Sequence, residues 1–159
     1  MLERLVDKGL QINQDKSRWV KDQVEYLGFL LNRDGVEPEP MKIQGIIDMG
    51  NPEIQRHVRE FVGMVKFYKN MWPKRSAILT PLTNLTGKGK KFVRGEAQDK
   101  AFKKMTRQIA KSAMLAFPNF DLPFDLYTDV SEYQIGACLI KREESELSIG
   151  CFARKFNSA

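Results

Sequence analysis

The chain has 159 residues, 42% of them hydrophobic, which is enough for one domain or two small ones with a real core. Its formal net charge of +6 favours nucleic acid or another acidic partner, and no apolar run approaches the roughly 18 residues of a membrane span. A single histidine makes a histidine-built metal site or a Ser-His-Asp triad hard to assemble. Two cysteines and the lack of an apolar signal segment indicate an intracellular protein, cytoplasmic or nuclear.

The first third of the chain consists of short elements joined by turns. Residues 2–6 have helical spacing, and Gly9 is placed to end that helix. Alternating apolar residues predict a short strand over 10–12 and a second strand over 24–31. The second strand closes on residues 32–35, Asn-Arg-Asp-Gly, which is a hairpin turn signal.

Two helices follow, over about 41–49 and 56–72, and the second carries the first candidate site. Its buried stripe is formed by Val58, Phe61, Val62 and Val65, and its outer face by Arg56, Arg59, Gly63 and Lys66. A glycine inside a helix lowers stability by roughly 1 kcal/mol relative to alanine, so the presence of Gly63 needs an explanation. Two remain open: a phosphate backbone lies against Gly63 between the cations, or another helix packs there and the charges are merely solvated.

The middle of the chain is interrupted by Pro73 and Pro81, and a further helix is predicted over 96–111. Its inner side presents three apolar residues, and its outer side is basic, with Lys100, Lys103, Lys104, Arg107 and Lys111. A solvated face accounts for these charges better than a binding surface does.

From Phe124 the hydrophobic period becomes two, which predicts a strand that ends at Asp129. A hairpin follows, with strands over 136–141 and 147–154 and a loop over 143–146. A four-residue loop pairs Ile140 with Ile149 and Cys138 with Cys151. In a reducing compartment we expect the two cysteines to be buried thiols rather than a disulfide.

Five stretches, taken in order, resemble one family. They are KGLQINQDKS (8–17), VEYLGFLLNRDGVEPEPMKI (24–43), VREFVGMVKFYKNMWPKRSAILTPLTNLT (58–86), AMLAFPNFDLPFDLYTDVSEYQIGACL (113–139) and FARKFN (152–157). In this order and spacing they are similar to the Pol polyprotein of gypsy-type LTR retrotransposons, from just after the polymerase aspartates into the ribonuclease H domain. The resemblance covers nearly the whole chain.

The resemblance implies an α+β fold in three parts. Residues 1–36 correspond to the end of the palm with a primer-grip hairpin, residues 37–116 to the helical thumb, and residues 117–159 to the first strands of an RNase H-like sheet.

The resemblance also implies roles for individual residues. Lys16 matches the palm lysine near the phosphates of the incoming nucleotide, a catalytic role, and Asp129 matches the first metal-binding, catalytic aspartate of ribonuclease H. Tyr26, Leu27 and Gly28 match the primer grip. On this interpretation the face of Arg56, Arg59, Gly63 and Lys66 follows a template–primer duplex.

The sequence departs from the family in ways that bear on activity. The polymerase aspartate pair and the further ribonuclease H carboxylates are not in the sequence, while Arg94 and Val130 replace a common aromatic residue and a common alanine. We therefore expect Mg²⁺ in the complete parent enzyme and no cofactor for this chain alone.

Two functions remain open. The first is a fragment of a reverse transcriptase and ribonuclease H that grips template–primer duplex, works with the remainder of a Pol polyprotein, and is inactive alone. The second is a non-catalytic module of retroelement origin that binds nucleic acid or serves as a structural subunit of a larger assembly.

Overall fold

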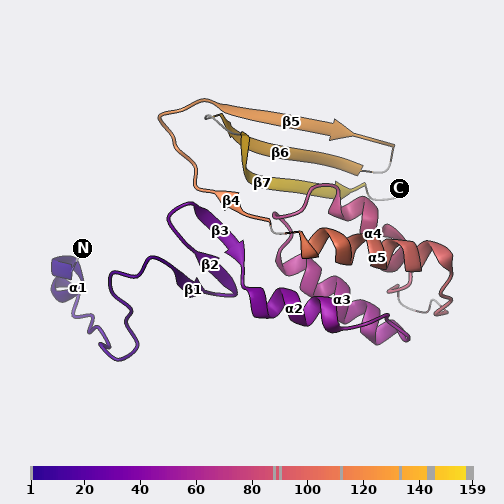
Figure 1. The fold of residues 1–159 in the computed structure, drawn as a ribbon, viewed down its shortest axis with the longest axis horizontal. Coiled ribbons are helices and arrows are strands. Elements are labelled where there is room, and N and C mark those ends of the chain that lie inside the picture. Colours follow the sequence, from indigo (N-terminus) through magenta and orange to yellow (C-terminus); the bar gives the residue numbers. More distant parts are fainter. Residues whose placement is uncertain are drawn as a thin grey trace.

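The computed structural model describes residues 2–87, 89, 91–111, 113–132, 134–142 and 146–156. The elements, in chain order, are α1 (Leu2–Asp7), β1 (Val24–Tyr26), β2 (Phe29–Leu31), β3 (Gly35–Pro38), α2 (Pro40–Asp48), α3 (Gln55–Phe67), α4 (Arg75–Thr83), α5 (Glu96–Ala110), β4 (Leu115–Ala116), β5 (Phe124–Val130), β6 (Gln134–Arg142) and β7 (Glu146–Lys155). A helical region, α2 to α5, lies beside two antiparallel sheets, ordered β1-β2-β3-β4 and β5-β6-β7 (Figure 1).

The core of the molecule lies between the four helices. The predicted stripe of α3, Val58, Phe61, Val62 and Val65, is buried. It packs against the apolar side of α5, where the rings of Phe61 and Phe102 are 4.7 Å apart. Helices that are amphipathic in sequence therefore bury one side each and leave their polar sides outward.

Two helical predictions need correction. The long helix ends at Phe67 rather than at residue 72, because Tyr68 leaves helical geometry with ψ of 33° and Met71 and Trp72 enter the core from the following turn. Helix α4 was not predicted, since it contains Pro81. The ring lies in the last turns of a short helix whose Ile78, Leu79 and Leu82 are buried, so packing outweighs the cost of the proline.

The first sheet also differs from the sequence prediction. The single strand expected over 24–31 is two strands, joined by a two-residue turn at Leu27 and Gly28 with φ of 49° and 83°. Positive φ at both central positions matches the twist of a tight hairpin. The second turn is as predicted, and the Asn32 side chain accepts hydrogen bonds from the backbone of Asp34 and Gly35 at 2.9 and 2.8 Å.

The N-terminal segment contains the predicted helix α1 and lacks the predicted strand. Gly9 follows the helix with φ of 66°, as its placement indicated. Residues 10–13 have no regular structure, and Leu10 and Ile12 are exposed. A strand needs a neighbour, and none of the described strands pairs with this segment.

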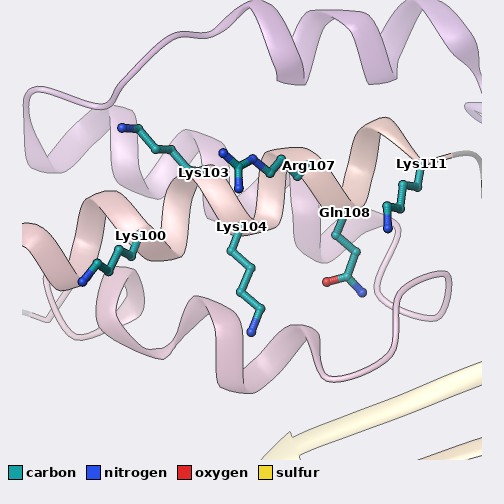
Figure 2. A pocket seen from close by; sticks show the side chains of 6 residues that line it. All are labelled: Lys100, Lys103, Lys104, Arg107, Gln108 and Lys111. Atoms are coloured by element: carbon teal, nitrogen blue, oxygen red, sulfur yellow. The ribbon is translucent and has the colours of Figure 1, made fainter.

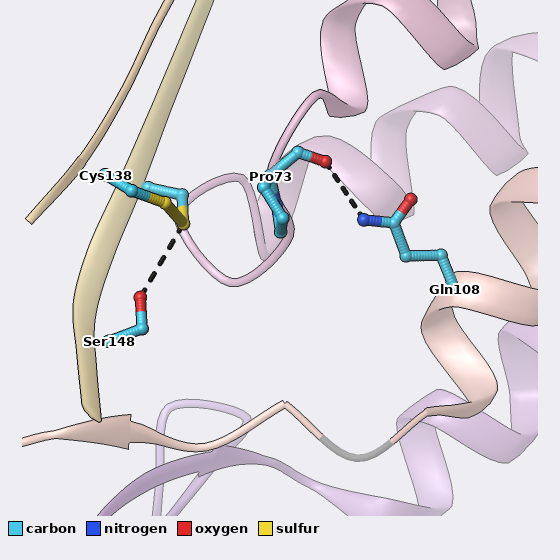
Figure 3. The surroundings of a disulfide bond; sticks show 5 residues. Pro73, Gln108, Cys138 and Ser148 are labelled. Carbon is cyan, nitrogen blue, oxygen red and sulfur yellow. Dashed lines mark hydrogen bonds between the residues drawn. A yellow bond between two sulfur atoms is a disulfide. The ribbon is translucent and has the colours of Figure 1, made fainter. Parts of the chain in front are cut away.

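The second sheet docks on the helical region through β7. The backbone N–H of Cys151 donates to the carbonyl of Asn70, between α3 and α4, at 2.8 Å. Cys138 and Cys151 are opposite one another, as predicted, but they form a disulfide, so the expected pair of free thiols is wrong (Figure 3). With Cα atoms 4.3 Å apart, directly paired cysteines bring their sulfur atoms within bonding reach.

The predicted pairing of Ile140 with Ile149 is also wrong. An irregularity between Leu139 and Ile140 shifts the register, and Ile140 pairs with Ser148. Residues 143–145 of the predicted loop lie outside the described residues. Among the helices that the structure describes, none is long and apolar enough to cross a membrane.

Candidate nucleic-acid interface

An apolar groove of about 520 Å³ runs between α2 and α3. Its lining residues are Lys42, Gly45, Ile46, Met49, Gly63, Met64, Phe67 and Tyr68. A Cβ atom added at Gly45 or at Gly63 would meet no heavy atom of the described chain within 4 Å. The alternative that Gly63 makes a close helix–helix contact is therefore wrong for the described residues, and both glycines face open space.

The three cations predicted on α3 differ in their surroundings. Arg56 Nε lies 2.8 Å from Glu60 Oε1, so a carboxylate already neutralises it. Arg59 Nη2 donates to Gln55 Oε1 at 3.1 Å and to the carbonyl of Thr86 at 3.3 Å. These acceptors are uncharged, so they orient Arg59 without cancelling its charge.

Lys66 completes the cationic face. It is exposed in the last turn of α3 and forms no ion pair with a residue that the structure describes. Arg59 and Lys66 are thus the stronger candidates for contact with an anion, and Arg56 is the weaker one.

The turn at Leu27 and Gly28 adjoins one end of the groove. The Gly28 carbonyl accepts hydrogen bonds from the Tyr68 hydroxyl at 2.8 Å and from the Glu39 N–H at 3.0 Å. Phe29 stacks on Phe67, with ring centroids 5.6 Å apart, and meets the edge of Tyr68 at 5.2 Å. Tyr26 and Leu27 themselves stay exposed, at 60% and 71%. The fold thus joins the predicted grip to the predicted helix face.

Tyr68 fastens this junction, and its hydroxyl is electrostatically perturbed. Burial, and secondarily the Glu39 carboxylate, raise the pKa of Tyr68 above the ordinary value of 10.0. A protonated hydroxyl is the form that donates to Gly28.

Lys16 is not brought to this groove by any contact among the described residues. It is exposed in a turn, where its backbone N–H donates to Asn13 Oδ1 at 3.1 Å. The segment between α1 and β1 extends away from the helical region (Figure 1).

Asp129 lies near the end of β5, at the edge of a hollow of about 160 Å³. Its carboxylate is 67% exposed and lies 3.8 Å from Lys74 Nζ, at the start of α4. The described residues contain no group of three histidine, cysteine or carboxylate ligands that could hold a metal ion. Asp129 is therefore a single carboxylate paired with a lysine in the described part of the chain.

Comparison with known proteins places this chain in a family. Residues 95–159 match the family described as the RNase H-like domain found in reverse transcriptase. The chain is 32% identical over 151 residues to the retrovirus-related Pol polyprotein from transposon gypsy of Drosophila melanogaster, with 87% of the chain covered. It is 30% identical over 169 residues to the one from transposon opus of the same species, with 99% covered. The chain is homologous to a segment of retrotransposon Pol polyproteins.

This Pol segment is short beside its relatives, since it spans 15% of the gypsy polyprotein and 17% of the opus polyprotein. The family match begins at residue 95, ahead of residue 117, where the RNase H-like part was predicted to start. The boundaries 1–36, 37–116 and 117–159 stay predictions.

The Pol segment shares its fold with the foamy viral protease-reverse transcriptase, solved in complex with an RNA/DNA hybrid. The TM-score is 0.74 with 17% identity, covering 90% of this chain and 20% of that one. At that identity the likeness concerns the fold alone. The predicted α+β class and the RNase H-like region are confirmed.

Sequence reasoning missed the opposite wall of the groove. Gly45 is the signal that could have found it, because a second exposed glycine inside a helix raises the same question as Gly63. Phe67 was assigned to no role, and its position between Gly28 and the groove became visible only after folding.

Proposed function

We propose that this Pol segment grips a template–primer duplex in the groove between α2 and α3, as part of a reverse transcriptase and ribonuclease H. The observation that carries the proposal is the pair of glycines, Gly45 and Gly63, which leave both walls of an apolar groove open. A glycine inside a helix lowers the stability of the helix, and a Cβ atom at either of these two would meet no other part of the described chain. We therefore expect a bound molecule to lie against them.

Each part of the groove has a role in this proposal. Met49, Met64 and Phe67 offer apolar surface to sugars and base edges. Gly45 and Gly63 let the nucleic-acid backbone approach the helices closely, while Arg59 and Lys66 contact phosphates on one side. These contacts do not distinguish one base from another, so binding is independent of the nucleotide sequence.

The adjoining turn holds the primer strand. Tyr26 and Leu27 present exposed side chains at the end of the groove, beside the half-buried Gly28, and the aromatic contacts of Phe29 keep the turn in place. We propose that Lys16 neutralises phosphate charge at the nucleotide site once the remainder of a Pol polyprotein completes the palm.

Magnesium chemistry needs ligands beyond those that the structure describes. Asp129 offers one carboxylate, and no group of three metal ligands exists among the described residues, so they do not fit a two-metal site. A second candidate function is a non-catalytic module that uses the same groove to bind nucleic acid, and the geometry of the groove fits it equally.

The test is Gly63→Leu, with His57→Leu, another exposed position of α3, as the matched control. Leucine is a better helix former than glycine, so the free energy of unfolding should stay unchanged or rise by about 0.5 kcal/mol. Binding of a fluorescent 20-base-pair RNA/DNA hybrid, followed by anisotropy, should weaken about tenfold or more for Gly63→Leu. The control should bind as the wild type does.

Salt titration adds a second readout. Replacing Arg59 and Lys66 by glutamine should lower the slope of log K against log salt by about 0.9 for each lost phosphate contact on B-form DNA of the same length. A Gly63→Leu variant that is stable and keeps wild-type affinity would refute the groove as the duplex site.

A further inference from the structure

A second cationic surface lies on α5, and the proposed grip does not use it. The surface is a shallow hollow of about 790 Å³, lined by Lys100, Lys103, Lys104, Arg107, Gln108 and Lys111 (Figure 2). Lys103 and Arg107 project toward one edge of the helix, and Lys104 and Lys111 toward the other. We call these four cations the α5 basic face.

The pairing of charges along α5 distinguishes this face from a solvated surface. In the first turn, Lys100 Nζ pairs with Glu96 Oε1 at 2.6 Å, and Asp99 pairs with Arg94. Beyond it, none of the four cations of the basic face forms an ion pair with a residue that the structure describes. The carboxylates are confined to the start of the helix.

This arrangement works against the helix itself. Lys103 and Arg107 are four residues apart, as are Arg107 and Lys111, and like charges at that spacing destabilise a helix. The helix dipole compensates only within the last turn. A face selected for stability alone would place carboxylates among these cations, so the repulsion points to an external anion.

The spacing fits a nucleic-acid strand. Lys103 and Lys111 are eight residues apart, which is about 12 Å along a helix, so the four cations form a row that successive phosphates of one strand can follow. Phe102, the aromatic residue of this helix, is buried, so the face offers charge and no stacking platform. It therefore suits backbone phosphates and reads no bases.

The location of the face limits which strand can reach it. Helices α3 and α5 pack through their apolar sides, with the rings of Phe61 and Phe102 4.7 Å apart, so their outer sides face away from each other. A duplex seated against α3 is stiff, with a persistence length of about 150 base pairs, and cannot bend around to α5. A single strand that continues beyond the duplex is flexible enough to do so.

We propose that the α5 basic face binds the backbone of a single-stranded extension of the duplex, independently of sequence. The route of this extension rests on the proposed duplex site, whereas single-strand binding by α5 does not.

The test compares a blunt 20-base-pair hybrid, the same hybrid with a 12-nucleotide RNA tail, and the tail RNA alone. The α5 variant replaces Lys103, Lys104, Arg107 and Lys111 by glutamine, a good helix former, and should melt at the wild-type temperature or above it. The charge control replaces Lys8, Arg18, Lys21 and Lys155, all exposed, by glutamine. Both variants lower the formal net charge of +6 by four.

For the wild type and the charge control, the tail should tighten binding about tenfold and steepen the salt dependence, by up to about 2.8 in slope for four single-strand contacts. The α5 variant should lose this gain, bind the tail RNA alone more weakly, and keep its affinity for the blunt hybrid. A gain that survives in the α5 variant, no gain in the wild type, or an equal loss on blunt and tailed hybrids would each overturn the proposal.

The same three probes separate this proposal from the proposed function. Loss of blunt-hybrid binding in Gly63→Leu reports on the groove between α2 and α3. Weak blunt-hybrid binding in the wild type, together with tail binding that depends on α5, would refute the groove and leave the α5 assignment standing.

Discussion

At the scale of single residues, Tyr68 connects the two halves of the candidate interface. It lies at the end of α3, lines the groove, and donates to the carbonyl of Gly28 forty positions earlier in the chain. That hydrogen bond and the aromatic contacts of Phe29 together hold the exposed turn at the end of the groove.

We predict that Tyr68→Phe lowers the free energy of unfolding at pH 7 by about 1 kcal/mol, the usual net value of one hydrogen bond. The Gly28 carbonyl keeps the Glu39 N–H as a donor at 3.0 Å, so it is not left unpaired. Tyr26→Phe, an exposed tyrosine in the same hairpin, is the control and should have little effect.

The same variant tests the raised pKa. Above pH 10.0 the unfolded tyrosine ionises while folded Tyr68 keeps its proton, so the wild type loses stability as pH rises toward the folded pKa. Phenylalanine cannot titrate, so the stability gap between wild type and variant should narrow above pH 10.0. Denaturant unfolding at pH 7 and at about 10.5 measures the gap; a constant gap contradicts the pKa shift.

At the scale of elements, the β6–β7 hairpin combines a disulfide with the docking of the second sheet. Cys151 is buried, is bonded to Cys138, and donates its N–H to Asn70. The covalent link therefore restrains the strand that joins the sheet to the helical region.

We predict that reduction of this disulfide destabilises the second sheet by about 3 kcal/mol, the chain-entropy value for a loop of roughly this size. The cysteines are 13 residues apart in sequence. Thermal unfolding with and without dithiothreitol should differ for the wild type and coincide for a Cys138→Ala, Cys151→Ala variant. Detection of two free thiols by mass spectrometry in protein never exposed to reductant would contradict the bond.

At the scale of the whole molecule, neither of the two residues predicted to be catalytic, Lys16 and Asp129, belongs to a group of three metal ligands among the described residues. Asp129 pairs with Lys74, and Lys16 lies in a segment that extends away from the helices. The groove between α2 and α3, by contrast, is lined on both sides by residues of this chain. Binding in the groove is therefore the proposed property that can be tested on these 159 residues alone.

We predict that a polypeptide of these 159 residues neither extends a primer nor cleaves the RNA strand of a hybrid, with Mg²⁺ or Mn²⁺ present. One carboxylate cannot hold two cations about 4 Å apart against their repulsion. Primer extension and hybrid cleavage assays measure this, with Asp129→Asn as the control. Metal-dependent cleavage that Asp129→Asn abolishes would show that the site is complete.

The sequence by itself determined much of the local structure. Apolar periodicity located α2, α3, α5 and the strands of the second sheet, because a residue's place on a helix or strand follows from spacing alone. The turn at Asn32 could be predicted in the same way, since the Asn32 side chain accepts hydrogen bonds from the backbone only two and three residues further along. The α+β class was also predicted from the sequence, because the order and spacing of the motifs resemble those of a family with that fold.

Only the tertiary structure decided how distant segments meet. Burial of Met71, Trp72 and Leu82 ended α3 early and kept α4 helical around Pro81. Pairing of Cys138 with Cys151 was visible in the sequence, but the bond depended on three-dimensional distance. Gly45 and Gly63 became a single groove because long-range packing placed α2 beside α3, and such packing depends on the shapes of all the core side chains together.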